Sequence, residues 1–133
     1  MSRLTIFLAR LIGLFTVLLV ATLLMRGSAI VEPAVTNDPL MFTYAIISLS
    51  IGLAMVLGHN VWSGGALPVI VTLVGWLILA KGLLLLYLTP EALHRVFEGM
   101  QYSDHMLLYV APSLVIGLYL TWAGFTSPTS RGL

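Results

Sequence analysis

The chain has 133 residues, of which 59% are hydrophobic and only 8% are charged, and its mean hydropathy is +1.06. A single soluble domain of this length could not bury so many apolar side chains, so the surplus must face lipid or a partner. The net charge of +1 argues against nucleic-acid binding, and the absence of cysteine excludes disulfides, thiol nucleophiles and metal–thiolate sites.

Four apolar segments, at about 4–25, 40–57, 66–88 and 106–125, are each close to the ~20 residues that a helix needs to cross a membrane. Lipid offers the backbone no hydrogen-bond partner, so each segment is predicted to be helical. Short connections make successive helices antiparallel. The sequence therefore predicts one all-α membrane domain over residues 1–133, an up-down-up-down bundle of four transmembrane helices.

A cleavable secretory signal is the alternative interpretation of the first segment, because Arg3 and Arg10 precede its apolar run and small residues follow at 27–29. Met25 and Arg26, however, lie where a cleavage region needs small uncharged residues, so we favour a retained span. Arg10 lies ~9 Å inside this span at 1.5 Å per residue. Its long side chain can still reach the interface, where we expect it to act as an anchor.

Small residues recur at helical spacing in the second and third segments, which predicts close helix packing. They are the pairs Ser48–Gly52 and Ala54–Gly58 and the stripe Thr72, Gly75, Leu79 and Gly82. Pro112, with Ser113 beside it, lies inside the fourth segment and predicts either a kink or a locally opened hydrogen-bond ladder there.

The third segment and the connection before it hold the candidate functional residues. His59, Asn60 and Trp62 in that connection are expected at a membrane interface. Trp76 lies near the middle of the segment, and its indole N–H is expected to find a partner inside the bundle. Lys81 lies ~10 Å from the segment's end, a depth at which an ionisable group is by default a functional candidate.

Lys81 has three ways to be accommodated at this depth. It can pair with an acid such as Asp104 or Glu98, pair with backbone carbonyls, or lose its proton. Simple snorkelling or structural pairing is the interpretation that we favour over a functional role.

A short interfacial helix is predicted over residues 90–100, before the fourth span, with Thr89 as N-cap, Pro90 at its first position and Glu91 in its first turn. Its apolar residues share one face, and its charged residues occupy the rest. The apolar set is Leu93, Val96, Phe97 and Met100, and the polar set is Glu91, His94, Arg95 and Glu98. A connector is favoured over a lid above a cavity.

The distribution of charge weakly favours both termini in the cytoplasm. Arg3, Arg10 and Arg131 lie on the side of the termini, against Arg26 and Arg95 on the other. The second side carries all five carboxylates, which are Glu32, Asp38, Glu91, Glu98 and Asp104. This acidic surface is either a set of solvated loop residues, which we favour, or a surface that attracts cations or a basic partner.

The histidines do not form a pattern that predicts a cofactor or metal. His59 and His105 lie at opposite ends of the spans, ~30 Å apart, so they cannot ligate one haem iron. His94 and His105 share a side, but the chain has neither an H-x-x-x-H nor an H-E-x-x-H spacing. We therefore predict no cofactor, no metal and no catalytic residue.

The stretch from Gly58 to Gly82 reads GHNVWSGGALPVIVTLVGWLILAKG. It resembles a group of small bacterial inner-membrane proteins described as integral membrane proteins of unknown function. The resemblance implies a multipass protein of the bacterial cytoplasmic membrane, and it carries over no site residue.

Two hypotheses for function follow. The first is a noncatalytic membrane protein that acts by helix association in the bilayer, as a homo-oligomer or as an accessory subunit of a larger complex. The second is a small carrier or channel subunit for a proton, cation or small molecule, in which Lys81 and Trp76 line a path.

Overall fold

The computed structural model describes residues 2–30, 37–100 and 105–128. These residues form helices and their connections, with no strand among them. The elements are α1 (Arg3–Arg26), the 3-10 turn η1 (Ser28–Ile30), α3 (Asp38–Gly58), α4 (Ala66–Tyr87), α5 (Pro90–Met100) and α6 (Met106–Thr126). In this part of the chain α1, α3, α4 and α6 are the helices long and apolar enough to cross a membrane, so the predicted four-span fold is confirmed.

Side chains cap three of these helices as their local sequences require. Ser2 Oγ accepts the N–H of Thr5 at 3.1 Å at the start of α1, and Asn37 Oδ1 accepts the N–H of Leu40 at 3.2 Å at the start of α3. Thr89 Oγ1 accepts the N–H of Ala92 at 3.2 Å, which confirms the predicted start of α5. Each cap satisfies an N–H that has no partner within its helix.

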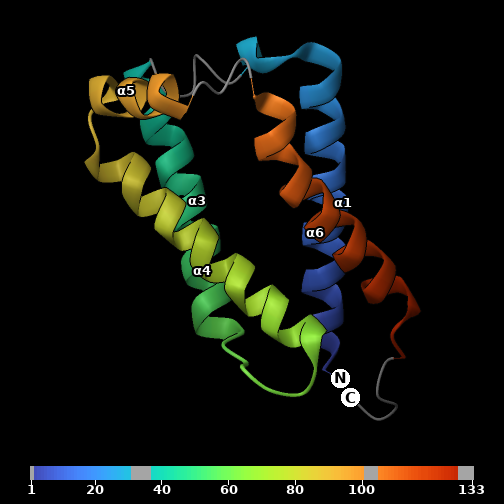
Figure 1. The fold of residues 1–133 in the computed structure, drawn as a ribbon. Helices are drawn as coiled ribbons and strands as arrows, with labels where there is room; N and C mark the ends of the chain where they lie inside the picture. Colours follow the sequence, from blue (N-terminus) through green and yellow to red (C-terminus); the bar gives the residue numbers. More distant parts are fainter. Residues whose placement is uncertain (1, 31–36, 101–104, 129–133) are drawn as a thin grey trace.

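The spans form two antiparallel pairs, α1 with α6 and α3 with α4 (Figure 1). Glycines make the close approach possible. A Cβ added at Gly52 would lie 2.5 Å from the Cα of Leu79, and one added at Gly82 would lie 2.6 Å from the backbone nitrogen of Leu49. The predicted contact through the Gly82 stripe and the Ser48–Gly52 pair is therefore present, whereas Gly58 has no neighbouring atom within 4 Å of that position.

The α1–α6 pair uses the same device, which we did not predict. A Cβ added at Gly13 would lie 2.5 Å from the backbone nitrogen of Thr121, and one at Gly117 would lie 3.0 Å from a methyl group of Thr16. Both glycines are buried. Side-chain-free positions thus let the backbones of the first and last spans touch.

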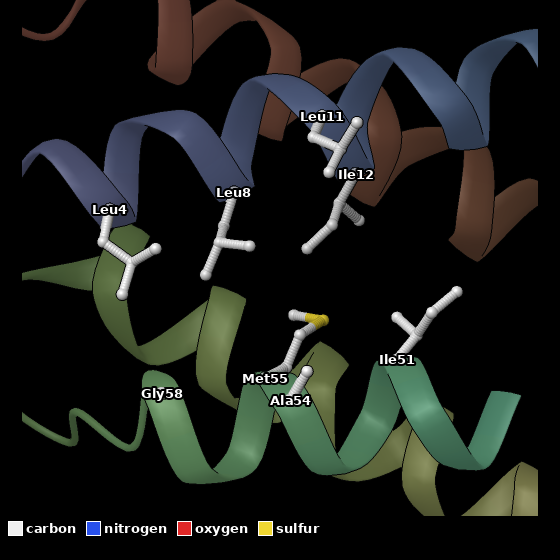
Figure 2. Close-up of a pocket in the computed structure, with 8 residues that line it drawn as sticks. All are labelled: Leu4, Leu8, Leu11, Ile12, Ile51, Ala54, Met55 and Gly58. Carbon is white, nitrogen blue, oxygen red and sulfur yellow. The ribbon is translucent and has the colours of Figure 1, made fainter. Parts of the chain in front are cut away.

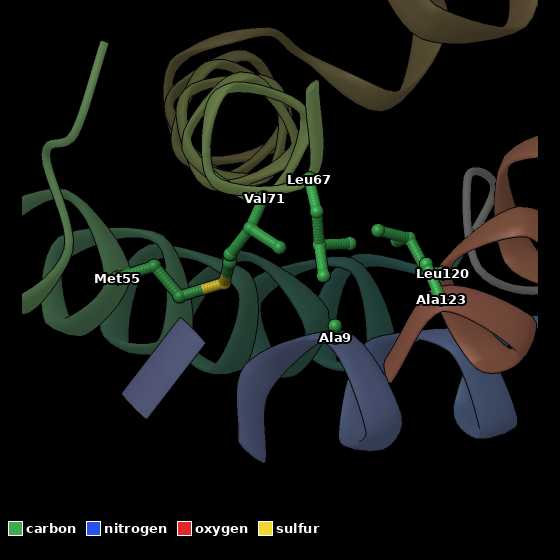
Figure 3. Packing of buried hydrophobic residues seen from close by; sticks show 6 residues of the cluster. All are labelled: Ala9, Met55, Leu67, Val71, Leu120 and Ala123. Carbon is green, nitrogen blue, oxygen red and sulfur yellow. The ribbon is translucent and has the colours of Figure 1, made fainter. Parts of the chain in front are cut away.

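The two pairs converge at the end of the molecule that holds the N-terminus and the 58–65 connection, and they diverge toward α5 (Figure 1). A buried apolar cluster joins both pairs at the converging end (Figure 3). Its members are Ala9, Met55, Leu67, Val71, Leu120 and Ala123. The cluster at the α5 end draws only on α3, α4 and α5, through Met41, Ala45, Leu85 and Leu93. The described core therefore connects the α1–α6 pair to the α3–α4 pair at the converging end.

Helix α5 lies across the ends of α3 and α4 (Figure 1). Leu93 is buried against them, while Glu91, His94, Arg95 and Glu98 are exposed. The Nε2 atom of His94 lies 3.0 Å from Oε1 of Glu98 one turn later. The predicted amphipathic helix is present, although Val96 is exposed and the side chains of Phe97 and Met100 lie outside the described part of the structure.

Pro112 lies within α6, which continues through it as one helix. The missing N–H of a proline leaves the carbonyl of the residue four positions earlier, Leu108, without its usual donor. The helix continues past this position, and the kink stays a prediction.

Candidate functional site: a buried histidine where three helices meet

The connection after α3 packs against the first turns of α4. His59 ends α3, and its N–H bonds the carbonyl of Met55 at 2.7 Å. Val61 then binds Thr72 through both backbone groups, because its N–H donates to Thr72 Oγ1 at 3.0 Å and its carbonyl accepts from that hydroxyl at 2.8 Å. Thr72 lies six residues into α4, so α4 begins about 9 Å beyond the level where α3 ends.

This arrangement buries the side chain of His59 between α1 and α4. The imidazole is 3% exposed, and the two threonines that it contacts are buried as well. Its Nε2 lies 2.8 Å from Thr5 Oγ1 of α1, and its Nδ1 lies 3.1 Å from Thr72 Oγ1 of α4. One ring therefore joins the end of α3 to the first and third spans. His59 occupies the predicted connection, but its burial was not anticipated.

The hydrogen-bond donors fix the tautomer that this site favours. Thr72 Oγ1 is surrounded by carbonyl oxygens, of which those of Val61 at 2.8 Å and Pro68 at 3.0 Å are nearest, so its single proton goes to a carbonyl. The hydroxyl must then accept from Nδ1–H of His59. In the neutral ring Nε2 is left as the acceptor, and Thr5 donates to it.

The chain of donors continues to the N-terminal cap. Once Thr5 donates its proton to His59, its oxygen can accept from the hydroxyl of Ser2, which lies 2.8 Å away. Each side chain in this series therefore donates a hydrogen bond to the next. Ser2 donates to Thr5, Thr5 to His59, His59 to Thr72, and Thr72 to a backbone carbonyl. Every polar side-chain atom buried among the described residues has a partner.

The side chain of Asn60 contacts the indoles of Trp62 and Trp76. Its Oδ1 accepts the Nε1–H of Trp62 at 2.7 Å and lies 3.5 Å from Nε1 of Trp76, at the limit of a hydrogen bond. All three side chains are exposed. Trp76 was expected to face the bundle, but it is 43% exposed and reaches the connection that follows α3.

Arg10 connects α1 to the end of α6. Its Nε donates to the carbonyl of Gly124 at 2.8 Å, and its guanidinium lies 4.8 Å from the centre of the Phe125 ring. In an α-helix the carbonyl of Gly124 would bond the N–H of residue 128, but that residue is proline and has none. Arg10 supplies the missing donor. It lies near the end of its span, as expected, and its role in the structure is to bind α6.

Lys81 is exposed on α4, and no described residue forms an ion pair or hydrogen bond with it. Of the two acids named as candidate partners, Glu98 contacts His94 instead, and Asp104 lies outside the described residues, as do Glu32 and Arg131. Lys81 and Trp76 both lie on α4, but the structure does not bring them to a common contact in its described part.

A cavity of about 310 Å³ opens between α1 and α3 at the converging end (Figure 2). Its lining is aliphatic, apart from a methionine and a glycine. The residues are Leu4, Leu8, Leu11 and Ile12 of α1 and Ile51, Ala54, Met55 and Gly58 of α3. Neither Lys81 nor Trp76 belongs to the lining. Helix α5, considered as a possible lid, lies at the opposite end of the spans (Figure 1).

Sequence reasoning missed three features of this region. Thr5 and Thr72 carry the contacts of His59, although Thr72 was considered only as a small packing residue. The signal available was a hydroxyl near the predicted end of a span on each side of a histidine. The third feature is the α1–α6 contact, for which the spacing of Gly117 and Gly124 with Thr121 between them was the available sign.

Among the described residues no group of three histidine, aspartate or glutamate side chains is placed to hold a metal ion. No family model matches the chain, and neither a curated protein nor a solved structure shows significant similarity to it. The resemblance noted for residues 58–82 therefore stays a prediction. The structure is that of a multipass membrane protein. At one end of its spans, a hydrogen-bonded set of four side chains, which we call the polar clasp, consists of Ser2, Thr5, His59 and Thr72.

Proposed function

We propose that this chain is a noncatalytic membrane protein that acts by associating, through its helices, with a second copy or with another membrane protein. The proposal includes insertion in a bacterial inner membrane with both termini in the cytoplasm. The arginines on the side of the termini, Arg3, Arg10 and Arg131, outnumber Arg26 and Arg95 on the other side, and this difference supports that orientation.

One observation carries the proposal. The stripe of α1 that lines the cavity continues toward the diverging end with Phe15 and Leu19, and the matching stripe of α3 continues with Ile47 and Tyr44. All four side chains are exposed. We call these four residues the open face. The faces that would meet in a closed bundle are instead left without a partner within the described chain.

The small buried fraction of each span also supports association. Only 22 to 33% of each span is buried inside the chain, so most of every helix is available to lipid or to another helix. Association in lipid depends on packing rather than on a hydrophobic driving force. The chain already uses close glycine packing within each pair, and large apolar side chains on the open face offer a further helix a surface to fill.

The alternative, a carrier or channel subunit, needs a path lined by Lys81 and Trp76. Both side chains are exposed, and the cavity between α1 and α3 is lined without them. The exposed apolar side chains of the open face support the association hypothesis, whereas the cavity between α1 and α3 gives no support to a path through Lys81 and Trp76.

Cysteine crosslinking tests the proposal directly, because the chain has no cysteine of its own. Leu19→Cys and Ile47→Cys place a thiol on the open face, and Leu77→Cys places one at an exposed position of α4 away from it. Each variant is treated in native membranes with a short bifunctional thiol reagent or a photoreactive thiol label, and the products are identified by mass spectrometry.

The proposal expects the Leu19→Cys and Ile47→Cys variants to form defined protein adducts, either with a second copy or with one recurrent membrane protein. Leu77→Cys should give only lipid adducts or weak, unspecific products. If the open-face variants label lipid to the same extent as Leu77→Cys, and the protein is a monomer by native mass spectrometry, association through this face is wrong.

A further inference from the structure

The cavity between α1 and α3 has a size and position that suit one occupant. It extends from Leu4 to Ile12 along α1, ~12 Å at 1.5 Å per residue, beginning at the converging end of the spans. Figure 2 shows the aliphatic side chains of the two helices facing each other across it. An apolar cavity of this kind stays free of water, and the molecule that surrounds a membrane span is lipid.

A helix from another chain does not fit this space. An α-helix with its side chains is ~10 Å across, so a volume of about 310 Å³ holds roughly one turn of it or less. A hydrocarbon chain is far thinner and can occupy the same volume in an extended form. The cavity is thus distinct from the open face, whose four residues, Phe15, Leu19, Tyr44 and Ile47, do not line it.

The charged residues near one end of the cavity, which we call its mouth, indicate the charge of the headgroup. Leu4 and Gly58 lie at this mouth, and Arg3, which is exposed, immediately precedes Leu4. Arg10 is already committed to α6, and the nearby His59 is buried by its two threonines. The described carboxylates belong to α3 and α5 at the opposite end (Figure 1).

Asp38, Glu91 and Glu98 are those described carboxylates. Arg3 is therefore an exposed cation next in the chain to a residue that lines the cavity, and the described carboxylates lie at the other end of the spans. A cation at the membrane surface attracts the headgroup of an anionic lipid, at about 1 kcal/mol for each basic residue. Exposed Asn60 follows the end of α3 here and offers polar groups at the same level.

We propose that the cavity is a binding site for one anionic phospholipid, with an acyl chain between α1 and α3 and the phosphate beside Arg3. The acyl chain supplies the packing that α1 and α3 do not make with each other across the cavity. The headgroup supplies selectivity for anionic over zwitterionic lipid. The site thus goes beyond the proposed association and occupies a different surface from the open face.

The methyl group of Met55 provides a probe that needs no substitution, because its side chain projects into the cavity (Figure 2). The full-length protein, labelled with ¹³C at its methionine methyl groups, is placed in phosphatidylcholine nanodiscs. A small fraction of phosphatidylglycerol or phosphatidylcholine with a spin label on the acyl chain is then added. Met41, buried in the other cluster, and Met25, exposed at the far end of α1, serve as internal references.

Spin-labelled phosphatidylglycerol is expected to broaden the Met55 signal at about fivefold lower lipid fraction than spin-labelled phosphatidylcholine, the factor that corresponds to ~1 kcal/mol for one basic residue. Met25 should respond equally to both lipids. Arg3→Gln should remove the difference at Met55, while Arg26→Gln at the other end of α1 should leave it unchanged.

Gly58→Leu tests the acyl-chain part of the site. No atom lies within 4 Å of a Cβ added there, so the variant should fold while its side chain blocks the mouth. Gly99→Leu on α5, which is equally unobstructed, is the matched control. Gly58→Leu should abolish the selective broadening of Met55 and Gly99→Leu should keep it.

Equal broadening of Met55 by the two lipids overturns the proposal, as does selective broadening that persists in both Arg3→Gln and Gly58→Leu. Contacts from Met55 to a second copy, detected between differently labelled protomers, would also overturn it, because the cavity would then be a protein interface. None of these outcomes depends on crosslinking at the open face, so the lipid site and the proposed association can fail separately.

Discussion

Thr5 and His59 are 54 positions apart in the chain, yet Thr5 Oγ1 lies 2.8 Å from Nε2 of the imidazole in a buried contact. The same ring reaches Thr72 on its other side at 3.1 Å. Since a buried polar group without a partner is costly, each of these contacts constrains the helix that carries it. The converging end of the molecule is therefore fixed by polar bonds as well as by the apolar cluster around Val71.

Thr72→Val should destabilise the protein by about 2 kcal/mol. The change keeps the shape of the side chain but removes the acceptor for Nδ1–H of His59 and for the N–H of Val61, leaving buried donors unpaired. The measurement is the free energy of unfolding in mixed micelles. Thr43→Val is the control, because that hydroxyl is exposed and bonds only the carbonyl of Pro39 in its own helix. Equal losses for the two variants would contradict the role assigned to Thr72.

The tautomer of His59 can be read from the ¹⁵N chemical shifts of its ring. We expect a ring proton on Nδ1, because Thr72 donates its own proton to a carbonyl and must accept from that nitrogen. Thr5→Val removes the donor to Nε2 and should shift the Nε2 resonance with little change at Nδ1. A ring protonated at Nε2 in the unaltered protein would show that the donor chain runs the other way.

Arg10→Met should cost about 1 to 3 kcal/mol, since it leaves the carbonyl of Gly124 without a donor and removes the cation from the ring of Phe125. Pro128→Ala restores a backbone N–H that can reach this carbonyl once α6 extends by one residue beyond the bond from Ser127 to Ala123. The loss caused by Arg10→Met should be smaller in the Pro128→Ala background. A double-mutant cycle on unfolding free energies measures this, and strict additivity would mean that the two residues do not share the carbonyl.

Gly52→Ala should push α3 and α4 apart, because the added Cβ would lie 2.5 Å from the backbone of Leu79, which cannot rotate away. Overpacking of this kind costs about 1 to 3 kcal/mol. Gly99→Ala is the control in open space, where alanine should be neutral or stabilising because it favours helix. Thermal unfolding followed by size-exclusion chromatography compares them. A melting temperature for Gly52→Ala at or above that of the unaltered chain would contradict the close approach.

The spans could be predicted from the sequence because lipid imposes one requirement on every residue of a long apolar segment. The caps at Thr89 and the small-residue contacts at Gly52 and Gly82 follow from local spacing and were also predicted. The sequence did not predict which helices pair with each other. The spacing of Gly117 and Gly124 marks a packing face without naming the helix that meets it.

Trp76 lies near the middle of its helix, as predicted, but the sequence did not show which neighbours its side chain contacts. The hydrogen bonds between Val61 and Thr72 show that the connection folds back along α4, and Asn60 then contacts Trp76. The same fold buries His59, which a hydropathy pattern cannot distinguish from an exposed interfacial histidine. Such tertiary placement requires coordinates.

The pairing of α1 with α6 has a consequence for biosynthesis. The third span follows the second after a short connection, so α3 and α4 can associate as soon as both have entered the bilayer. The first span, in contrast, meets its partner only when the last one arrives, and the bond from Arg10 to Gly124 joins positions 114 residues apart. During synthesis the backbone of α1 at Gly13 therefore stays uncovered until α6 is complete, even though Thr5 of the same helix can already contact His59.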